Sequence, residues 1–337
     1  MAGQAKLQGI VLTLLALTAG HSAYAGSARF CYHQRHQQCL TTPAAINDAG
    51  WVVGDFAEFS PSGYRSFLRA PDGTMTIIDV PGEPCDDFPM SINRGGVIAG
   101  YFQDKGCGKL HGFIRAGDGT VTVVDVQGAD GAGLASINNK GVSAGSYSDG
   151  QGTHGFVRAS EGTITSFEVA GARRTDVAAI NNRGEIAGDY VDEFGSVHGY
   201  LRSAKGAVTT FAVPDGTSTY VAGLNDLGEV SGTYSAGQSL VFGYVREPDG
   251  TFKKINPDSS NEVEISGINN SGVVTGAYLS NADSTSYAFT WAPDGTVTII
   301  RRKRTHDMIP AAINNKGDVT GFFAPNPETE KGFVWKP

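Results

Sequence analysis

The stretch Ile180–Tyr190, which reads Ile-Asn-Asn-Arg-Gly-Glu-Ile-Ala-Gly-Asp-Tyr, carries the pattern that decides the fold. An Asn follows a short apolar run. A Gly stands three residues after that Asn, a second Gly seven residues after it, and an aromatic residue nine residues after it. Asn and Gly adopt the backbone angles that tight hairpin turns require, and the residues after the turn alternate as in a β-strand. We therefore predict a β-hairpin whose turn begins at Asn181.

The same markers occur seven times along the chain, at intervals of 43 to 46 residues. The residues that begin the pattern, called the anchor asparagines below, are Asn47, Asn93, Asn138, Asn181, Asn225, Asn269 and Asn314. Each unit also contains a third strand, as in His154–Arg158, and a fourth strand that follows an Asp-Gly turn, as in Thr120–Val126. Four strands in about 45 residues are typical of a propeller blade.

The two ends of the chain predict how the array of units is completed. The last unit stops after its third strand, within Gly332–Pro337, and an additional strand near Arg29–Tyr32 precedes the first anchor. The residue two positions before each anchor is small, which suits an innermost strand: Ala45, Ser91, Ser136, Ala179, Gly223, Gly267 and Ala312. We therefore predict an all-β fold, a seven-bladed β-propeller with four antiparallel strands per blade. An N-terminal strand is expected to complete the last blade and leave no free edge.

The first 25 residues have the features of a secretory signal peptide. Lys6 is their only charge, an apolar run extends over Ile10–Leu17, and Ala23–Ala25 supplies a small-x-small cleavage pattern. No later stretch has about 20 successive apolar residues, so we expect no integral membrane segment. We predict a signal peptide over residues 1–25, a single propeller domain over 26–337, and a secreted or periplasmic location.

Four cysteines lie in the predicted mature chain, and an even number in an exported protein favours disulfides. The pairs Cys31–Cys39 and Cys85–Cys107 close the shortest loops, and the order of strands places the second pair on one face. A metal site is the alternative, but no Cys-x-x-Cys occurs and no His lies at ligand spacing. We expect neither a metal nor a cofactor.

The charge balance narrows the classes of partner. The chain has 34 acidic and 26 basic residues, a net charge of −8, and removal of Lys6 with the signal peptide leaves −9. Nucleic acids and anionic membranes reward net positive charge. We therefore exclude nucleic acid, expect an extracellular glycan or protein as the partner, and expect a monomer.

These repeats resemble the HAF family, a bacterial extracellular repeat family, over nearly all of residues 28–337. The hallmark His-Gly-Phe stands at His111–Phe113 and His154–Phe156, and as His-Gly-Tyr at His198–Tyr200. The resemblance implies an exported repeat protein with a propeller fold, and it implies no shared catalytic residues. Because the third strand lies about 10 Å outward from the innermost one, the three histidines diverge, and we interpret them as local packing residues.

One face of the predicted propeller carries the variable connections, which join the second strand to the third and each unit to the next. Binding sites often lie on variable loops over a rigid scaffold. The candidates are the departures from the repeat on this face: Asp86, Asp87, Arg173, Arg174, Asp176, Tyr220, Arg301, Arg302, Arg304 and His306. The basic run Arg301–Arg304 is suited to an acidic polymer. Asp86 and Asp87 are adjacent, so they point to opposite sides of a strand and are poor partners for a two-carboxylate glycosidase.

Two functions are consistent with these residues. The first is a binding or scaffold module that contacts an extracellular glycan or protein through the variable face. The alternative is a polysaccharide lyase acting on an acidic polymer, in which Arg301 neutralises a carboxylate and His306 or Tyr220 acts as the base. No Gly-x-Ser-x-Gly, His-Glu-x-x-His or Walker motif is present, so we favour the binding module.

Overall fold

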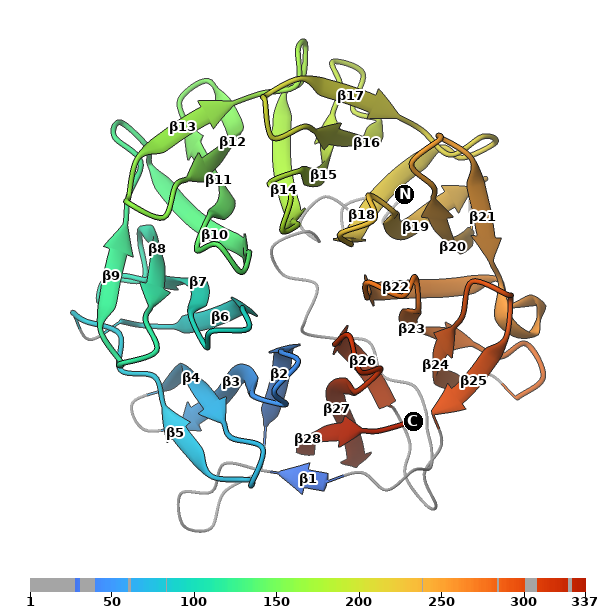
Figure 1. Cartoon of the computed structure of the whole chain (residues 1–337), viewed down its shortest axis with the longest axis horizontal. Helices are drawn as coiled ribbons and strands as arrows, with labels where there is room; N and C mark the ends of the chain where they lie inside the picture. The colour runs from blue at the N-terminus through green and yellow to red at the C-terminus, as the bar shows by residue number, and fades with distance from the viewer. Residues whose placement is uncertain are drawn as a thin grey trace, which may run out of the picture.

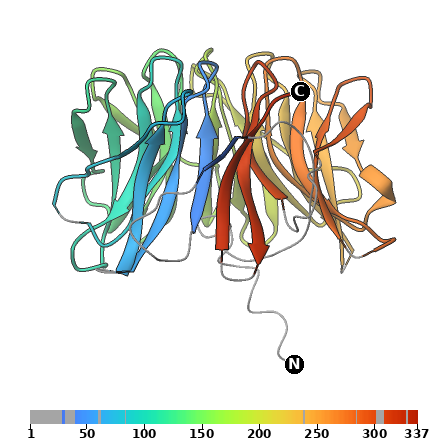
Figure 2. The same ribbon diagram turned by 90° about the horizontal axis from the view of Figure 1, so that it is seen from below.

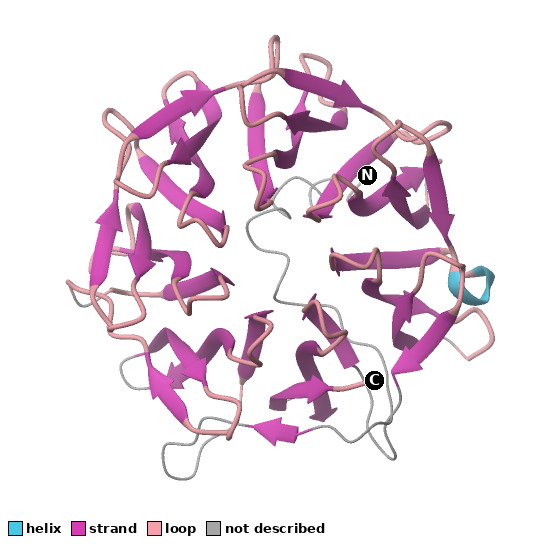
Figure 3. Ribbon diagram, viewed as in Figure 1, coloured by secondary structure: helices cyan, strands magenta, loops and turns pink. Residues whose placement is uncertain are grey.

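A computed structural model describes residues 28–30, 40–59, 62–82, 84–237, 239–283, 285–300, 308–326 and 329–337. These residues form β-strands joined by turns and loops, with one short 3-10 helix, η1 (Pro257–Ser259) (Figure 3). No helix in this part of the chain is long and apolar enough to cross a membrane. The predicted signal peptide, Cys31, Cys39 and Arg301–Asp307 lie outside the described residues.

The first two sheets have four strands each, in sequence order. They contain β2 (Thr41–Ile46), β3 (Val52–Phe59), β4 (Ser62–Arg69) and β5 (Met75–Ile77), then β6 (Asp87–Ile92), β7 (Ile98–Gln103), β8 (Leu110–Arg115) and β9 (Val121–Val124). All neighbouring strands within them are antiparallel, as the hairpin pattern predicts. A set of four such strands is called a unit below.

Two eight-stranded sheets follow. One contains β10 (Gly131–Ile137), β11 (Ser143–Asp149), β12 (Gly152–Arg158), β13 (Ile164–Phe167), β14 (Arg174–Ile180), β15 (Ile186–Val191), β16 (Val197–Arg202) and β17 (Val208–Phe211). The other contains β18 (Ser218–Leu224), β19 (Val230–Ala236), β20 (Leu240–Arg246), β21 (Phe252–Ile255), β22 (Glu262–Ile268), β23 (Val274–Leu279), β24 (Ser286–Trp291) and β25 (Val297–Ile300). Each is two units joined by one parallel residue pair, Thr153 with Arg174 and Val241 with Glu262.

The last sheet combines the two ends of the chain. It contains β26 (Met308–Ile313), β27 (Val319–Asn326), β28 (Thr329–Trp335) and β1 (Ala28–Phe30). β1 pairs antiparallel with β28, so the strand that the last unit lacks comes from the N-terminal side, where the sequence predicts it. Figure 1 shows the units arranged around a common axis, and Figure 2 shows their strands running between two faces.

The hydrophobic core lies between neighbouring units rather than at one centre. One cluster packs Val124 of β9 and Leu134 of β10 against Phe156 of β12. Another packs Phe67 of β4 against Val334 of β28, which joins the first and last sheets. Each unit therefore buries its apolar faces against its two neighbours, and no unit has a complete core of its own.

The anchor asparagines connect all the units through one continuous hydrogen-bond circuit. Their side chains are 2–7% exposed. Each Nδ2 donates to the backbone carbonyl of the next anchor at 3.0–3.1 Å, and Asn314 donates to Asn47 at 3.0 Å, which returns the circuit to its start. The sequence pattern predicts only the turn at these positions, and the link between units was not foreseen.

The other end of each anchor amide holds its own turn. The Oδ1 of Asn138 accepts hydrogen bonds from the backbone N–H groups of Lys140 (3.0 Å) and Val142 (3.1 Å), and Gly141 completes the turn at φ +77°. Asp offers the acceptor without the N–H donor, and Gln has a longer side chain. Asn alone supplies both functions at this distance from the backbone, which accounts for its presence in every unit.

We predict that Asn138→Asp lowers the free energy of unfolding by about 2–3 kcal/mol, because a carboxylate oxygen then faces the carbonyl of Asn181 where an N–H donated. Urea unfolding measures the loss. Asn139→Asp is the matched control, since Asn139 is exposed, its Oδ1 only accepts from Arg94 N, and Asp48 occupies the equivalent position in the first unit. Equal destabilisation by the two substitutions would contradict the structural role of the circuit.

Candidate functional site

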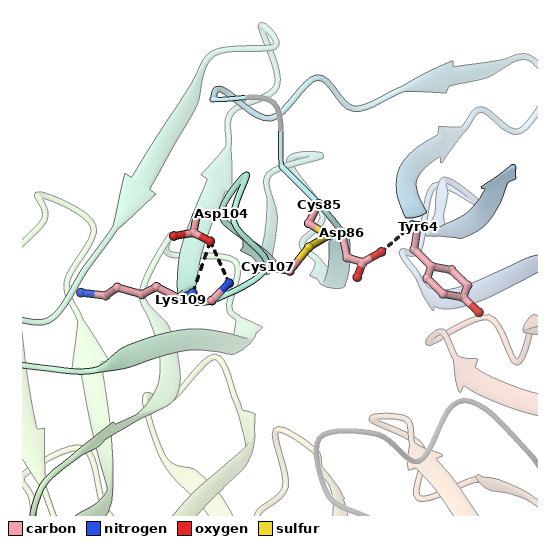
Figure 4. Close-up of a disulfide and its surroundings, with 7 residues drawn as sticks. Tyr64, Cys85, Asp86, Asp104, Cys107 and Lys109 are labelled. Atoms are coloured by element: carbon pink, nitrogen blue, oxygen red, sulfur yellow. Dashed lines mark hydrogen bonds between the residues drawn. A yellow bond between two sulfur atoms is a disulfide. The ribbon is translucent and has the colours of Figure 1, made fainter. Parts of the chain in front are cut away.

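The antiparallel order places the anchor turns on one face and the remaining connections on the other. We call the second the loop face; it carries the links between the second and third strands of a unit and between successive units. The disulfide Cys85–Cys107 joins two of these links, with a Cα–Cα distance of 5.4 Å and a sequence separation of 22. This pairing confirms the prediction for these two cysteines (Figure 4).

Hydrogen bonds around the disulfide fix the position of Asp86. Gln103 N donates to the backbone carbonyl of Asp86 at 2.8 Å, and Asp86 Oδ1 accepts from Tyr64 N of the preceding unit at 2.7 Å. On the other side of the disulfide, Asp104 Oδ1 accepts from Lys109 N at 3.3 Å (Figure 4). The disulfide therefore holds a loop that bridges two units and presents a carboxylate.

Asp87 has a different role from its neighbour. Its side chain is fully buried, one oxygen accepts from Ser66 N, and the other pairs with Arg65 Nε at 3.0 Å. Burial raises the pKa of Asp87, while the hydrogen bond from Ser66 and the charge of Arg65 act in the opposite direction. Asp87 thus joins two units, and Asp86, which is partly exposed, is the one of the pair that solvent reaches.

Asp55 of β3 lies close to both of them and is 8% exposed. Burial, together with the nearby charges of Glu330, Asp87 and Asp86, raises the pKa of Asp55 to about 8. Burial also raises the pKa of Glu330, a residue of β28. Asp55 is therefore a protonated, neutral acid at pH 7, because ionisation would place another negative charge among carboxylates.

A row of aromatic rings borders these carboxyl groups. The ring centroids of Tyr64 and Phe88 are 5.7 Å apart, and those of Phe88 and Tyr101 are 5.3 Å apart. Tyr64 is 38% exposed, and Figure 4 shows its ring extending away from the disulfide. Burial and the charges of Asp55 and Asp86 raise the pKa of Tyr101 to about 12, so the phenol stays neutral. We call this set the acidic–aromatic cluster: Asp55, Asp86, Asp87, Glu330, Tyr64, Phe88 and Tyr101.

The sequence identified only Asp86 and Asp87 of this cluster. Tyr64 and Glu330 flank loops whose sequences differ in every unit, so no repeat register singled them out. Asp55 and Tyr101 each stand eight residues after an anchor, and Phe88 stands five before one. Both positions vary between units, and Asp189 stands at the position equivalent to Asp55, so an alignment of the units does not single these residues out.

A second group of predicted residues forms a separate structure. Arg174 Nε pairs with a carboxylate oxygen of Asp176, which is 4% exposed. Burial raises the pKa of Asp176, and Arg174 opposes the shift. The backbone carbonyl of Tyr220 accepts from Tyr244 Oη at 3.0 Å, and that of Asp176 accepts from Tyr200 Oη at 2.9 Å. These contacts lie within single units: the first and third in the unit β14–β17, and the second in the unit β18–β21.

Arg173 is exposed beside this group, where its backbone N–H donates to Val191 O at 2.8 Å. None of the contacts described here joins this second group to the acidic–aromatic cluster. Arg301, Arg302, Arg304 and His306 lie outside the described residues, as does the predicted pair Cys31–Cys39. The basic run and the lyase arrangement built on it therefore stay predictions.

The three repeat histidines each contact carboxylates of their own unit. His111 Nδ1 lies 2.7 Å from Asp125, His154 Nε2 3.2 Å from Asp149, and His198 Nε2 3.0 Å from Asp192. Each imidazole also packs on the aromatic marker of its unit, at centroid distances of 5.1–5.3 Å. Among the described residues, no three His, Cys, Asp or Glu side chains are placed to hold a metal ion.

The opposite face has a central depression of about 170 Å³, lined by the anchors and the residues on either side of them. Its polar rim is engaged in hydrogen bonds: Asn182 N donates to Asp226 Oδ1 at 2.8 Å, and the same pattern continues to Asn315, which donates to Asp48. Arg94 occupies the equivalent rim position in the second unit. Its side chain supplies no acceptor oxygen, and its guanidinium lies 3.7 Å from the carboxylate of Asp48. We therefore assign this rim to stability and take the acidic–aromatic cluster as the candidate functional site.

Comparison with solved structures identifies the fold. The β-propeller domain of the Trilobed protease from Pyrococcus furiosus superposes with a TM-score of 0.64 and 12% identity, covering 89% of this chain and 94% of that one. A virginiamycin B lyase from Staphylococcus aureus gives 0.60 and 11%, covering 92% and 99%. At such low identity these likenesses show the fold alone, a β-propeller. No protein-family model matches the chain, and no curated protein sequence matches it.

We predict that the double substitution Cys85→Ser with Cys107→Ser lowers the free energy of unfolding by about 3 kcal/mol, because the unfolded chain loses a cross-link that spans some twenty residues. Chemical unfolding of the variant measures the loss. Reduction of the unmutated protein is the control and should give the same decrease. An unchanged midpoint would show that the loop carrying Asp86 is held without the disulfide.

We also predict that Asp55→Asn becomes progressively more stable than the unmutated protein as pH rises from about 4 to about 8. The folded chain retains a proton on Asp55 that the unfolded chain loses near pH 4, so ionisation favours unfolding by up to about 1.4 kcal/mol per pH unit. The difference levels off above the pKa of about 8. Urea unfolding across this range measures it, and Asp86→Asn is the partly exposed control. A difference independent of pH would show that Asp55 is ionised in the fold.

Proposed function

We propose that this chain is an exported, seven-bladed β-propeller that binds an extracellular glycan through the acidic–aromatic cluster on its loop face. The blade count rests on the seven anchor asparagines and on the circuit that returns from Asn314 to Asn47. Each anchor precedes the second strand of one unit, so each of the seven units is one blade. The N-terminal strand β1 supplies the fourth strand of the last blade.

The observation that supports a glycan is the row of rings beside partly exposed carboxyl groups. Tyr64, Phe88 and Tyr101 present neighbouring aromatic surfaces, and Tyr64 is the most exposed of them. The C–H faces of sugar rings pack on such surfaces, and carboxylates accept hydrogen bonds from sugar hydroxyls. A few polar groups among aromatic side chains are the usual composition of a ligand site.

The scaffold around the cluster supports binding rather than a purely structural role. Its residues come from three sheets, and the disulfide fixes the loop that carries Asp86. Rigid positioning reduces the entropy lost on binding. Export follows from the predicted signal peptide at residues 1–25 and is supported by the disulfide, which persists in oxidising compartments.

We predict that Tyr64→Ala weakens glycan binding at least about tenfold, because it removes the most exposed ring and retains the backbone N–H that Asp86 accepts. A glycan array followed by calorimetry on the retained glycans measures this. Phe194→Ala is the matched control: Phe194 is 85% exposed on the same loop face but belongs to another unit. Equal losses in both variants would indicate unspecific hydrophobic contact.

The same preparations distinguish the other kinds of partner. Retention of a secreted protein, with no glycan retained, would overturn the glycan proposal in favour of a protein-binding module. Formation of unsaturated products from an acidic polysaccharide, followed by absorbance, would overturn it in favour of the lyase built on Arg301 and His306.

A further inference from the structure

The position eight residues after each anchor shows what the fold requires of a side chain there. In three units this side chain accepts a hydrogen bond from the backbone of the next unit. Ser146 accepts from Val177 N at 3.0 Å, Asp189 from Val221 N at 2.9 Å, and Thr233 from Ile265 N at 3.2 Å. A polar group at this position therefore has a structural reason whenever the next unit offers an N–H.

Three other units offer no such donor. The residue four before the next anchor is Pro89, Pro310 or Pro43, and proline has no amide hydrogen. In two of these units the facing side chain is apolar, Ala277 or Phe322. The third is Asp55, opposite Pro89. An acceptor here has no structural use, since the same surroundings accommodate an alanine or a phenylalanine elsewhere in the chain.

The buried position of Asp55 is also unfavourable for a carboxyl group. Asp55 is 8% exposed, and in the described part of the chain its carboxyl accepts a hydrogen bond from its own backbone N–H and from no other residue. Among the described residues, the charged groups that act on it are acidic: Glu330 from β28, and Asp86 and Asp87 from the start of β6. Burying a carboxyl group that no other residue pairs with is unfavourable in the free protein. A cationic group of a bound ligand would supply such a partner.

Among the described residues no cation pairs with Asp55, and the nearby guanidinium of Arg65 is engaged by other carboxylates. Arg65, the basic residue beside them, pairs with Asp87 at 3.0 Å and lies 4.0 Å from Asp79. Burial, and after it the nearby carboxyl groups, raises the pKa of Tyr64 of β4 and of Tyr101 of β7. Neutral aromatic rings attract cations to their faces. The carboxyl groups and the aromatic rings therefore both favour a cationic ligand.

We propose that the glycan bound at the acidic–aromatic cluster carries free amino groups, as glucosamine oligomers do, and that an ammonium group of the ligand pairs with Asp55. This inference rests on the proposed function and specifies its ligand class. A bare metal ion does not fit, since no three ligating side chains converge in the described residues. An ammonium on a sugar ring needs only one or two carboxylates, and its ring packs on Tyr64 and Phe88.

Binding then releases a proton. Asp55 is protonated in the free protein and becomes a carboxylate when it pairs with the ammonium, so its proton passes to the buffer and no covalent bond changes. Among the described residues, the charged or titratable groups near Asp55 are the carboxyls of Glu330, Asp86 and Asp87 and the phenols of Tyr64 and Tyr101, and the Arg65 guanidinium pairs with Asp87. The ligand's charge offsets the repulsion that otherwise keeps Asp55 neutral.

The test compares two ligands of equal length, a glucosamine oligosaccharide and its fully N-acetylated counterpart, by calorimetry on the full mature chain at about pH 5.5. At that pH the free amines are charged. We expect the amine ligand to bind at least about tenfold more tightly, with up to one proton released per site, measured in two buffers of different ionisation enthalpy. Asp55→Asn should remove both the preference and the proton release.

Asp189→Asn is the matched control. Asp189 is also a buried carboxyl, with its pKa raised to about 7 by burial, but it accepts from Val221 N in another pair of units. Its replacement should leave ligand preference and proton release unchanged. Circular dichroism and urea unfolding confirm that each variant is folded before binding is measured.

The outcomes separate this inference from the proposed function. Equal affinity for both oligosaccharides, without proton release, would overturn the charged-ligand inference and leave glycan binding in place. Preference for the amine that survives in Asp55→Asn would overturn the role of Asp55. Absence of binding to either oligosaccharide, together with an empty glycan array, would overturn the proposed function itself.

Discussion

The hydrogen bond from each anchor Asn to the backbone of the next unit is the interaction on which the rest of the structure depends. It places a donor, an acceptor and a turn in one buried side chain, so each hairpin is fixed to its neighbour where the innermost strands meet. Each unit has no core of its own, and apolar residues are buried only between neighbours. The circuit sets the spacing at which those interfaces form, and the connections at the opposite ends of the strands are left free to vary.

The repeat explains why the fold could be predicted from sequence. Strand order and the Asn-x-x-Gly turns follow from spacing that recurs in every unit, and this strand order in turn predicts the contribution of β1 to the last sheet and the pair Cys85–Cys107. The link between units through Asn Nδ2 was missed because a turn alone accounts for Asn in the sequence. A contact between two units leaves no pattern in the sequence from which it could be predicted.

The candidate site was predictable only in part for the same reason. Asp86 and Asp87 were found because two acids interrupt a loop, but Arg174 and Asp176, which look equally distinctive, pair with each other within strand β14. Tyr64, Phe88 and Tyr101 come from three strands of two units and become neighbours only in the folded chain. Side chains that depart from a repeat are either functional or compensate for one another, and the contacts decide which.

Asp55 shows how these two cases can be separated. In five of the other six units an acceptor faces an N–H or an apolar residue faces a proline, and the sixth has Tyr101 opposite Leu134. Asp189 follows this pattern and contributes to stability, although burial raises its pKa as well. Asp55 departs from the pattern, because its carboxyl faces Pro89 among other carboxyls. A perturbed pKa alone does not distinguish the two residues, and the missing donor does. In a repeat protein the other units thus serve as internal controls, and a buried polar group that its own repeat does not explain points to a ligand.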